Sequence, residues 1–194
     1  VNFLERFYPE LIPLTSSCKS PMSMLSTLLK TYYAQQVGID PKKIFVVAVM
    51  PCTAKKFEAA RTEHVTPWGA PYTDAVLTTR EAIWLLKCFG VDFHNLDDGM
   101  FDSPLGVSSG AGDIFGATGG VMEAALRTAY ERVTGQELQD LVFDEVRGVE
   151  GVKENSIDLG GTVINVGVAN GLQNAKTLLD RVVSGEKTYH HIEI

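Results

Sequence analysis

Hydrophobic residues follow two different spacings along this chain, and each spacing predicts its own kind of element. Between Ser20 and Gln36 they recur every three or four residues, which is typical of one face of a helix. Residues 44–50, IFVVAVM, are instead a continuous apolar run, typical of a strand buried on both faces. The same criteria predict further strands within 74–80, 141–148, 156–161, 162–171 and 189–194, and further helices within 51–61, 78–90, 121–135 and 172–185.

Strands and helices therefore alternate along most of the chain. This order predicts an α/β fold with a mainly parallel central sheet, in which 44–50 is central and helices cover both faces. The sequence LGGT at 159–162 predicts one hairpin turn. Residues 92–120 are polar and rich in glycine, and we expect little regular structure there. We expect residues 1–194 to form a single lobe.

Composition and charge narrow the function classes. The chain has 194 residues and a net charge of −7, without a Lys/Arg-rich run, so we expect no nucleic-acid partner. We expect no membrane span, because no apolar run reaches about 18 residues, and the first residues do not resemble a signal peptide. The three cysteines are far apart, which favours a reducing compartment. We expect the cytoplasm, with the periplasm as the alternative if the segment is exported within a longer protein.

Cys52 and Lys55 are the first candidates for chemistry. Cys52 follows the proline that ends the run 44–50, and the carboxyl ends of strands are where α/β sheets place their sites. Lys55 lies one helical turn further on, and a nearby cation favours the thiolate, the form that binds metals. A free cysteine is more often buried filler. We interpret Cys88, on the apolar face of a helix, as such a core residue. Cys18, at a helix entrance, could be either reactive or structural.

The glycine-rich stretch SSGAGDIFGATGG at 108–120 is the second candidate. It leads into a helix, whose N-terminal N–H groups could bind an anion such as a nucleotide phosphate. Gly110, Gly112 and Gly116 do not match the dinucleotide pattern, and no Walker lysine follows. A nucleotide-binding domain is therefore our third hypothesis, and close approach of the backbone to another ligand remains open.

Five stretches together resemble the catalytic domain of the iron-only ([FeFe]) hydrogenases, in the same order and from end to end. They are TSSCKSPMSMLSTLLKTYYA at 15–34, VMPCTAKKFEAAR at 49–61, TDAVLTTRE at 73–81, SGAGDIFGATGGVMEAALRTAYE at 109–131 and VRGVEGVKE at 146–154. The combination of MPCxxKK with GATGGVMEAALR is highly specific. The resemblance implies one lobe of a two-lobed catalytic domain.

In that family a [4Fe–4S] cubane held by four cysteines is bridged to a two-iron centre with carbon monoxide and cyanide ligands, together called the H cluster. The resemblance implies that Cys52 is a cubane ligand and that Lys55 donates to an iron-bound cyanide. Thiolates are the usual ligands of iron–sulfur clusters, and an ammonium group suits an anionic acceptor. The remaining implied roles are a proton path for Ser16 and a two-iron pocket lined by Met50, with Pro21 close to the diatomic ligands. Phe115 and its glycine loop, which includes Gly116 and Thr118, would cover the cluster.

The resemblance also predicts what this segment lacks. The family's first ligand loop should lie just before Val1 and its last just after Ile194, so that Cys52 is one ligand of four. Met22 stands where many relatives have glutamine. We therefore expect a complete cofactor only with the flanking half of the domain or a second chain, and no stable cubane on residues 1–194 alone.

The leading hypothesis is an enzyme that interconverts protons, electrons and H₂, with a ferredoxin-like electron carrier as partner. The alternative is a related iron–sulfur protein or hydrogen sensor without turnover. Such a protein has less need of Met50, Lys55 and the complete glycine loop, all of which are present here.

Overall fold

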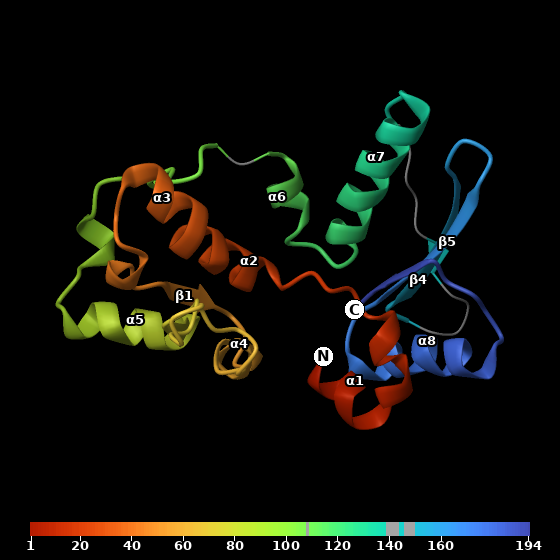
Figure 1. The fold of residues 1–194 in the computed structure, drawn as a ribbon, viewed down its shortest axis with the longest axis horizontal. Coiled ribbons are helices and arrows are strands. Elements are labelled where there is room, and N and C mark those ends of the chain that lie inside the picture. The colour runs from red at the N-terminus through yellow and green to blue at the C-terminus, as the bar shows by residue number, and fades with distance from the viewer. Residues whose placement is uncertain (108, 139–143, 146–149) are drawn as a thin grey trace. The chain divides into compact units, whose positions relative to one another are not determined.

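The structure is a computed structural model that describes residues 1–107, 109–138, 144–145 and 150–194. Its contacts divide the chain into two compact units, Tyr8–Gly106 and Val107–Ile194, and the second also includes Val1–Phe7 (Figure 1). We call them the 8–106 unit and the 107–194 unit and describe each by itself. The boundary falls within residues 92–120, where little regular structure was expected. The single lobe stays a prediction.

The 8–106 unit begins with helices whose ends follow local sequence signals. Pro21 is the first residue of α2, and the Ser20 side chain caps the helix by accepting from Ser23 N at 3.4 Å. Gly38, with φ of 68°, ends the last of the joined helical segments. The elements of this unit are η1 (Pro9–Leu14), α2 (Pro21–Leu28), η2 (Leu29–Tyr33), α3 (Ala34–Val37), η3 (Pro41–Lys43), β1 (Val47–Met50), α4 (Ala54–Ala59), β2 (Ala75–Thr78), α5 (Thr79–Cys88) and η4 (Phe93–Asn95).

A buried lysine ties these helices to the segment before β2. Lys30 lies in η2, a π-helical segment, and only 3% of its side chain is exposed. Its ammonium pairs with Asp74 at 2.6 Å and donates to the Pro71 carbonyl at 2.8 Å. Asp74 also accepts from Val46 N at 2.7 Å. Because the buried charge is paired and hydrogen-bonded, its burial is tolerated, and the start of β1 is fixed to the same site.

Strand β1 differs from the expectation of a central strand buried on both faces. It pairs in parallel with β2, from Val47 with Ala75 to Met50 with Thr78, and these two strands make up the whole sheet among the described residues. Val47 is 47% exposed and Val49 56%. That expectation was therefore wrong for the described part of the chain. An apolar run shows a preference for burial, but it does not supply the segment that covers it.

The 107–194 unit is built around a second sheet. Its elements are α1 (Asn2–Phe7), α6 (Ala111–Ile114), α7 (Gly120–Thr134), β3 (Asp144–Glu145), β4 (Val152–Asp158), β5 (Val163–Ala169), α8 (Leu172–Ser184) and β6 (His191–Glu193). The strand order is β3-β4-β5-β6, and only β5 and β6 run in parallel. The predicted hairpin is confirmed: Leu159 N donates to the Thr162 carbonyl at 2.8 Å between β4 and β5.

Helices α7 and α8 cover opposite faces of this sheet. On one face, Met122 and Leu126 of α7 pack on Val166 and Val168 of β5. On the other face, Leu178 of α8 packs with strand residues, and Figure 1 shows the two helices on either side of the strands. Strand β5 is therefore the most buried of the described strands, with Val166 at 1% and Val168 at 2% exposure. These contacts hold the start of α7, and the loop before it, against the sheet.

The α/β class is confirmed, although the strands form two small sheets instead of one mainly parallel sheet. The four-residue turn forces β4 and β5 to be antiparallel, and the long irregular stretch separates them from β1 and β2. Most of the predicted strand 141–148 lies outside the described residues, which include only β3 within it.

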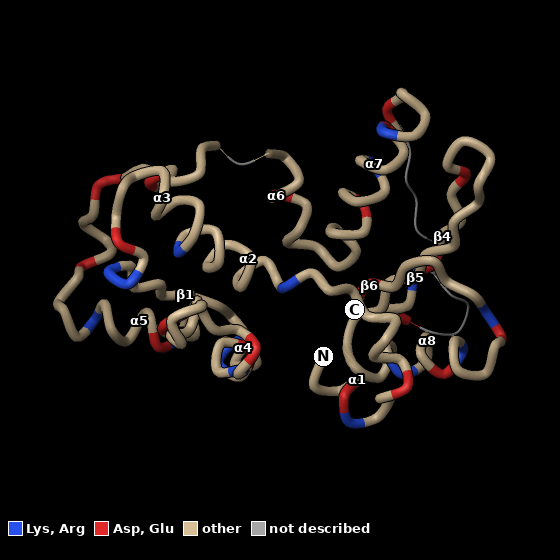
Figure 2. Tube along the Cα trace, viewed as in Figure 1, with Lys and Arg blue, Asp and Glu red and all other residues tan. Residues whose placement is uncertain are grey.

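Charged residues of both signs are interspersed along both units (Figure 2). Several of them pair, for example Lys176 with Asp180 at 2.5 Å on α8. None of the described helices is long and apolar enough to cross a membrane. The absence of a nucleic-acid partner stays a prediction.

Candidate functional site

Cys52 and Lys55 lie where β1 passes into α4. Strand β1 ends at Met50, and Lys55 N donates to the Cys52 carbonyl at 3.3 Å, so the first helical turn begins at the cysteine. Cys52 is exposed and its thiol is in no disulfide. Met50, the last residue of the strand, is half-buried. The chain thus presents an accessible thiol at the carboxyl end of a parallel strand, as the sequence predicted.

A carboxylate, Glu58, holds the Lys55 ammonium. Lys55 Nζ donates to Glu58 Oε2 at 2.7 Å, and the two side chains are 24% and 19% exposed. The other oxygen, Oε1, accepts from the Ser20 hydroxyl and from the Ser23 hydroxyl, the latter at 2.5 Å. Burial by itself raises the pKa of Glu58, but the hydrogen bonds from Lys55, Ser20 and Ser23 outweigh it and lower that pKa to about 2. Glu58 is therefore ionised at neutral pH.

This carboxylate brings together two segments that are distant in sequence. Ser20 is the cap of α2 and is followed directly by Pro21, so Lys55 and Pro21 share one neighbourhood. Ser16 lies just upstream, exposed, and its hydroxyl accepts from Cys18 N at 3.1 Å. The structure thus joins the Lys55 and Pro21 segments through Glu58.

The other two cysteines are both exposed. For Cys88 the interpretation as a core residue was wrong, although it does lie on the predicted helix α5. Trp84 on that helix is 67% exposed, and Phe89, which follows its last residue, is 76% exposed. The apolar pattern identified a face that prefers burial, but nothing in the described part of the chain covers it. Cys18 lies before α2, as expected, and we assign no role to it.

The three predicted site residues of the glycine loop lie in the 107–194 unit, between α6 and α7. Phe115, Gly116 and Thr118 are all exposed. The loop is closed by Ala117 N donating to the Ile114 carbonyl at 3.1 Å and by Gly120 N donating to the Ala117 carbonyl at 2.9 Å. The convergence of these residues with Cys52 stays a prediction.

The N-terminus of α7 already binds an anion, which is a side chain of this protein. Glu193 in β6 accepts from Gly119 N at 3.0 Å and from Met122 N at 2.5 Å, one bond to each carboxylate oxygen. These are the N–H groups that a nucleotide phosphate at this helix would use. The arrangement therefore speaks against the nucleotide hypothesis.

Sequence reasoning missed Glu58 and Glu193. The first had a local signal, because a carboxylate three residues after a lysine on a helix is placed to pair with it. Its bond to Ser23 spans 35 residues, and the bond of Glu193 to Met122 spans 71. No local pattern reports contacts across such distances.

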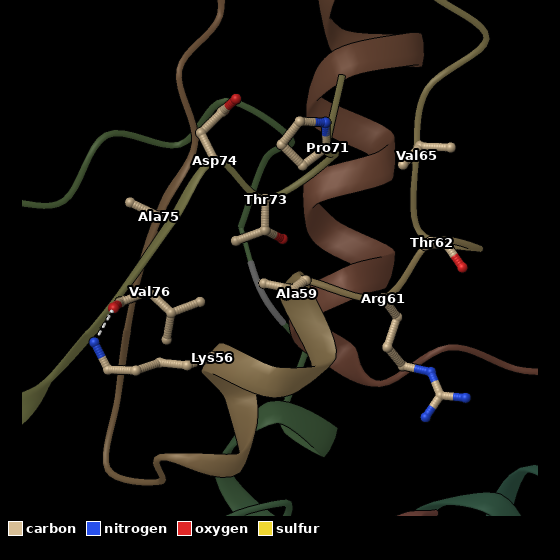
Figure 3. A pocket seen from close by; sticks show the side chains of 11 residues that line it. Lys56, Ala59, Arg61, Thr62, Val65, Pro71, Thr73, Asp74, Ala75 and Val76 are labelled. Atoms are coloured by element: carbon tan, nitrogen blue, oxygen red, sulfur yellow. Dashed lines mark hydrogen bonds between the residues drawn. The ribbon is translucent and has the colours of Figure 1, made fainter. Parts of the chain in front are cut away.

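A cavity of about 400 Å³ opens beside α4 and β2 (Figure 3). Its walls include Lys56, Thr73, Asp74 and Val76, and none of the predicted site residues lines it. Two charged side chains in these walls already have partners. Lys56 donates to the Val76 carbonyl at 2.9 Å, and Asp74 pairs with Lys30. We therefore do not assign the site to this cavity. The described residues also contain no group of three or more His, Cys, Asp or Glu side chains placed to hold a metal ion.

Comparison with known proteins decides the family. The model of the iron only hydrogenase large subunit, C-terminal domain, matches residues 1–194. The chain belongs to this hydrogenase family. A solved relative, apo [FeFe]-hydrogenase HydA1 from Chlamydomonas reinhardtii, has the same fold with a TM-score of 0.84 and 41% identity, over 99% of this chain and 55% of that one.

Two hydrogenases of known sequence are similar along the whole chain. The NADP-reducing hydrogenase subunit HndD of Solidesulfovibrio fructosivorans is 48% identical over 194 residues, which are 100% of this chain and 33% of that protein. The periplasmic [Fe] hydrogenase large subunit of Nitratidesulfovibrio vulgaris is 47% identical over 192 residues, 99% of this chain and 45% of that protein. The chain therefore spans between a third and a half of the length of these hydrogenases.

A more distant branch is also similar. Protein NAR1 of Arabidopsis thaliana is 32% identical over 196 residues, covering 94% of this chain and 41% of that protein. The hydrogenases thus share clearly more of the sequence than this branch does.

Proposed function

We propose that the protein containing this chain catalyses the reversible reaction 2H⁺ + 2e⁻ ⇌ H₂ at an H cluster. The observation that carries the proposal is the arrangement at the end of β1. There an exposed thiol, Cys52, is followed one turn later by an ammonium group, Lys55, which Glu58 holds in place. This arrangement occurs in a chain that matches the hydrogenase family over its full length.

The donor set of the 8–106 unit fits part of the cofactor. Cys52 would supply one thiolate to the cubane, and iron–sulfur clusters need several such ligands. The described residues contain no group of three or more His, Cys, Asp or Glu side chains that could hold a metal ion, and the other ligands would come from the flanking half of the domain or from a second chain. Met50 and Pro21 would give apolar walls to the two-iron centre, with Phe115, Gly116 and Thr118 over it. When bound, the H cluster would supply the iron site at which protons and electrons combine.

Lys55 would act as an oriented hydrogen-bond donor. An ammonium group has three N–H donors and Glu58 accepts one of them, so Lys55 can donate to a cyanide ligand as well. Glu58 in turn is fixed by two serine hydroxyls, which restricts the position of the ammonium group. A charge-assisted bond in a fixed direction would hold the two-iron centre more firmly than a mobile lysine would.

Protons would pass through Ser16 Oγ, which lies on an exposed segment and can both accept and donate. Electrons would arrive from a ferredoxin-like carrier through iron–sulfur clusters outside this segment. For the compartment we propose the cytoplasm, because the three cysteines are free. The alternative is the periplasm, since one of the similar hydrogenases is periplasmic.

The second candidate function is an iron–sulfur protein of this fold without hydrogen turnover. It is favoured by the similarity to the cytosolic iron-sulfur assembly component 3 of Rattus norvegicus, which is 30% identical over 190 residues. The hydrogenases, at 47% and 48%, favour the enzyme.

The test is anaerobic loading of the full-length protein with iron, sulfide and a two-iron precursor, followed by a hydrogen assay with a reduced dye. We expect H₂ from the wild type, and loss of both cubane iron and H₂ from Cys52→Ala, because a cubane that lacks one thiolate is bound poorly. Cys88→Ala is the matched control: an exposed free thiol of the same unit, whose loss should change neither.

Two results would contradict the proposal. A wild type that binds cubane and two-iron unit without producing H₂ would favour the second function. A Cys52→Ala variant that keeps its full cubane iron would show that Cys52 is not a ligand.

A further inference from the structure

Glu193 links the glycine loop to strand β6, which lies more than 70 residues later in the sequence. Strand β6 lies beside β5, and Glu193 is in register with Val168. From there its carboxylate accepts from Gly119 N and Met122 N, at 3.0 and 2.5 Å. Both oxygens are thus used, each on an N–H group that the first turn of a helix leaves without a helical partner. These two bonds join Glu193 to residues that lie 71 and 74 positions earlier in the sequence. They fix the start of α7 to β6.

The two glycines at this point allow the fastening. Gly119 has a φ of 89°, which residues other than glycine rarely adopt, and it lies against the Val168 side chain. A Cβ on Gly120 would lie 1.7 Å from the Ile114 carbonyl oxygen, so α6 and α7 meet here backbone to backbone. The loop Phe115–Thr118 therefore has one end against α6 and the other held by β5 and β6.

Between these fixed ends the loop faces outward. Phe115 is 45% exposed, and Gly116, Ala117 and Thr118 are exposed as well. A loop with fixed ends and exposed side chains is arranged to present those side chains to something outside the unit. The strand that fixes it, β6, is also the strand after which the resemblance places the last cluster-ligand loop.

We propose that Glu193 is a positioning residue for the H cluster. Its carboxylate fixes the loop Phe115–Thr118 relative to β6, so that the loop over the two-iron centre and the ligand loop expected after β6 keep a constant spacing. Glu193 acts through the backbone of α7 and does not touch the cofactor itself. The inference rests on the proposed function, because it assigns the loop to the H cluster.

A helix cap that serves stability alone is the competing explanation. Loss of such a cap would make hydrogen exchange at the capped amides faster, but it would leave the electronic environment of the cofactor unchanged. The carbon monoxide and cyanide stretching bands of the two-iron centre report that environment directly. They are therefore the measurement on which the two explanations differ.

The experiment compares Glu193→Ala and Glu193→Gln with the wild type, in the full-length protein loaded with its cofactor. The control is Asp158→Asn, because Asp158 is another carboxylate of this unit that accepts from a backbone group, Gly161 N at 2.6 Å, in the β4–β5 turn. Glutamine keeps the shape and one acceptor oxygen, and it serves if the alanine variant does not fold. Two readouts are recorded: amide hydrogen exchange at Gly119 and Met122, and the infrared bands.

We expect exchange at these amides to become about tenfold faster in Glu193→Ala, the effect of losing a helix cap with a charged acceptor. The infrared bands should shift or broaden and turnover should fall, with Glu193→Gln intermediate. Asp158→Asn should change exchange in its own turn and leave the bands unchanged. Faster exchange with unchanged bands and turnover in both Glu193 variants would overturn the proposal. A wild type without carbon monoxide and cyanide bands would overturn the proposed function itself, and the proposal with it.

Discussion

The two units of this chain bury different kinds of side chain. The largest fully buried residues all belong to the 107–194 unit; they are Met122, Val152, Val166, Val168 and Leu178. Among the described residues, the buried polar and charged ones all belong to the 8–106 unit; they are Ser23, Ser26, Lys30, Thr66 and Thr73. One unit thus has an apolar core between two helices and a sheet. In the other, hydrogen bonds and an ion pair occupy much of the interior.

This difference matches the kind of candidate site residue that each unit holds. Polar contacts depend on direction, so the network in the 8–106 unit fixes how side chains such as Lys55 and Glu58 point. An apolar core fixes the position of a backbone, and the 107–194 unit contributes a backbone loop fastened by Glu193. The unit proposed to hold the thiol and the ammonium group is therefore the one ordered by polar contacts.

A cavity in the apolar core should lower stability more than any other change proposed for these two units. Leu178 is 0% exposed, and Leu178→Ala should lower the free energy of unfolding of the 107–194 unit by about 3 kcal/mol, through lost burial and a cavity. Amide exchange of β5 measures this loss. The two tryptophans, Trp68 and Trp84, both lie in the 8–106 unit, so their fluorescence during urea unfolding reports that unit alone.

If the two units unfold independently, Leu178→Ala leaves the tryptophan transition of residues 1–194 unchanged. A tryptophan midpoint that shifts together with β5 exchange would instead support the single lobe predicted from the sequence. Val49→Ala is the matched control in β1: Val49 is 56% exposed, so its loss should cost less than about 0.5 kcal/mol.

A smaller effect is expected in the polar network. Glu58→Gln removes the charge that pairs with Lys55 and should lower the free energy of unfolding at pH 7 by about 2 kcal/mol, the range for hydrogen bonds to charged groups. The pKa of Glu58 is about 2 in the fold against 4.5 ordinarily, so its ionised form stabilises the fold above about pH 4.5. This contribution is lost as the pH falls from about 4.5 to about 2.

The difference in stability between wild type and Glu58→Gln should therefore narrow over that pH range, as measured by tryptophan fluorescence in urea. Glu10→Gln, which changes an exposed carboxylate of the same unit, should stay close to wild type throughout. A difference between wild type and Glu58→Gln that is the same at pH 7 and pH 3 would show that Glu58 does not stabilise the fold through its charge.

Local sequence signals predicted the elements well. The hairpin between β4 and β5 was predicted from the adjacent residues LGGT, and the Ser20 cap and the capping box of Thr78 with Glu81 are likewise contacts between near neighbours in the sequence. Each depends on backbone groups that neighbouring side chains satisfy, so the sequence contains the whole contact. Cys52 and Lys55 were found in the same way, from their place after a strand.

The wrong burial predictions and the missed contacts depend on segments that cover a face and on partners that are distant in sequence. The apolar run of β1 and the position of Cys88 show only that these residues prefer burial, and Val49 and Cys88 are exposed in the described part of the chain. The serine partners of Glu58 and the cap provided by Glu193 come from residues 35 to 74 positions away. Such contacts follow from tertiary structure, and resemblance to a family pointed to the site without pointing to them.

Lys55→Asn in the loaded full-length protein tests whether the ammonium group held by Glu58 binds the two-iron centre. Lys56→Asn is the control: the adjacent lysine donates to the Val76 carbonyl and pairs with Glu81, both at 2.9 Å, away from Glu58. We expect Lys55→Asn to keep its fold and cubane iron but lose most of the carbon monoxide and cyanide bands, while Lys56→Asn retains them. Unchanged bands and unchanged hydrogen turnover in Lys55→Asn would contradict the claim.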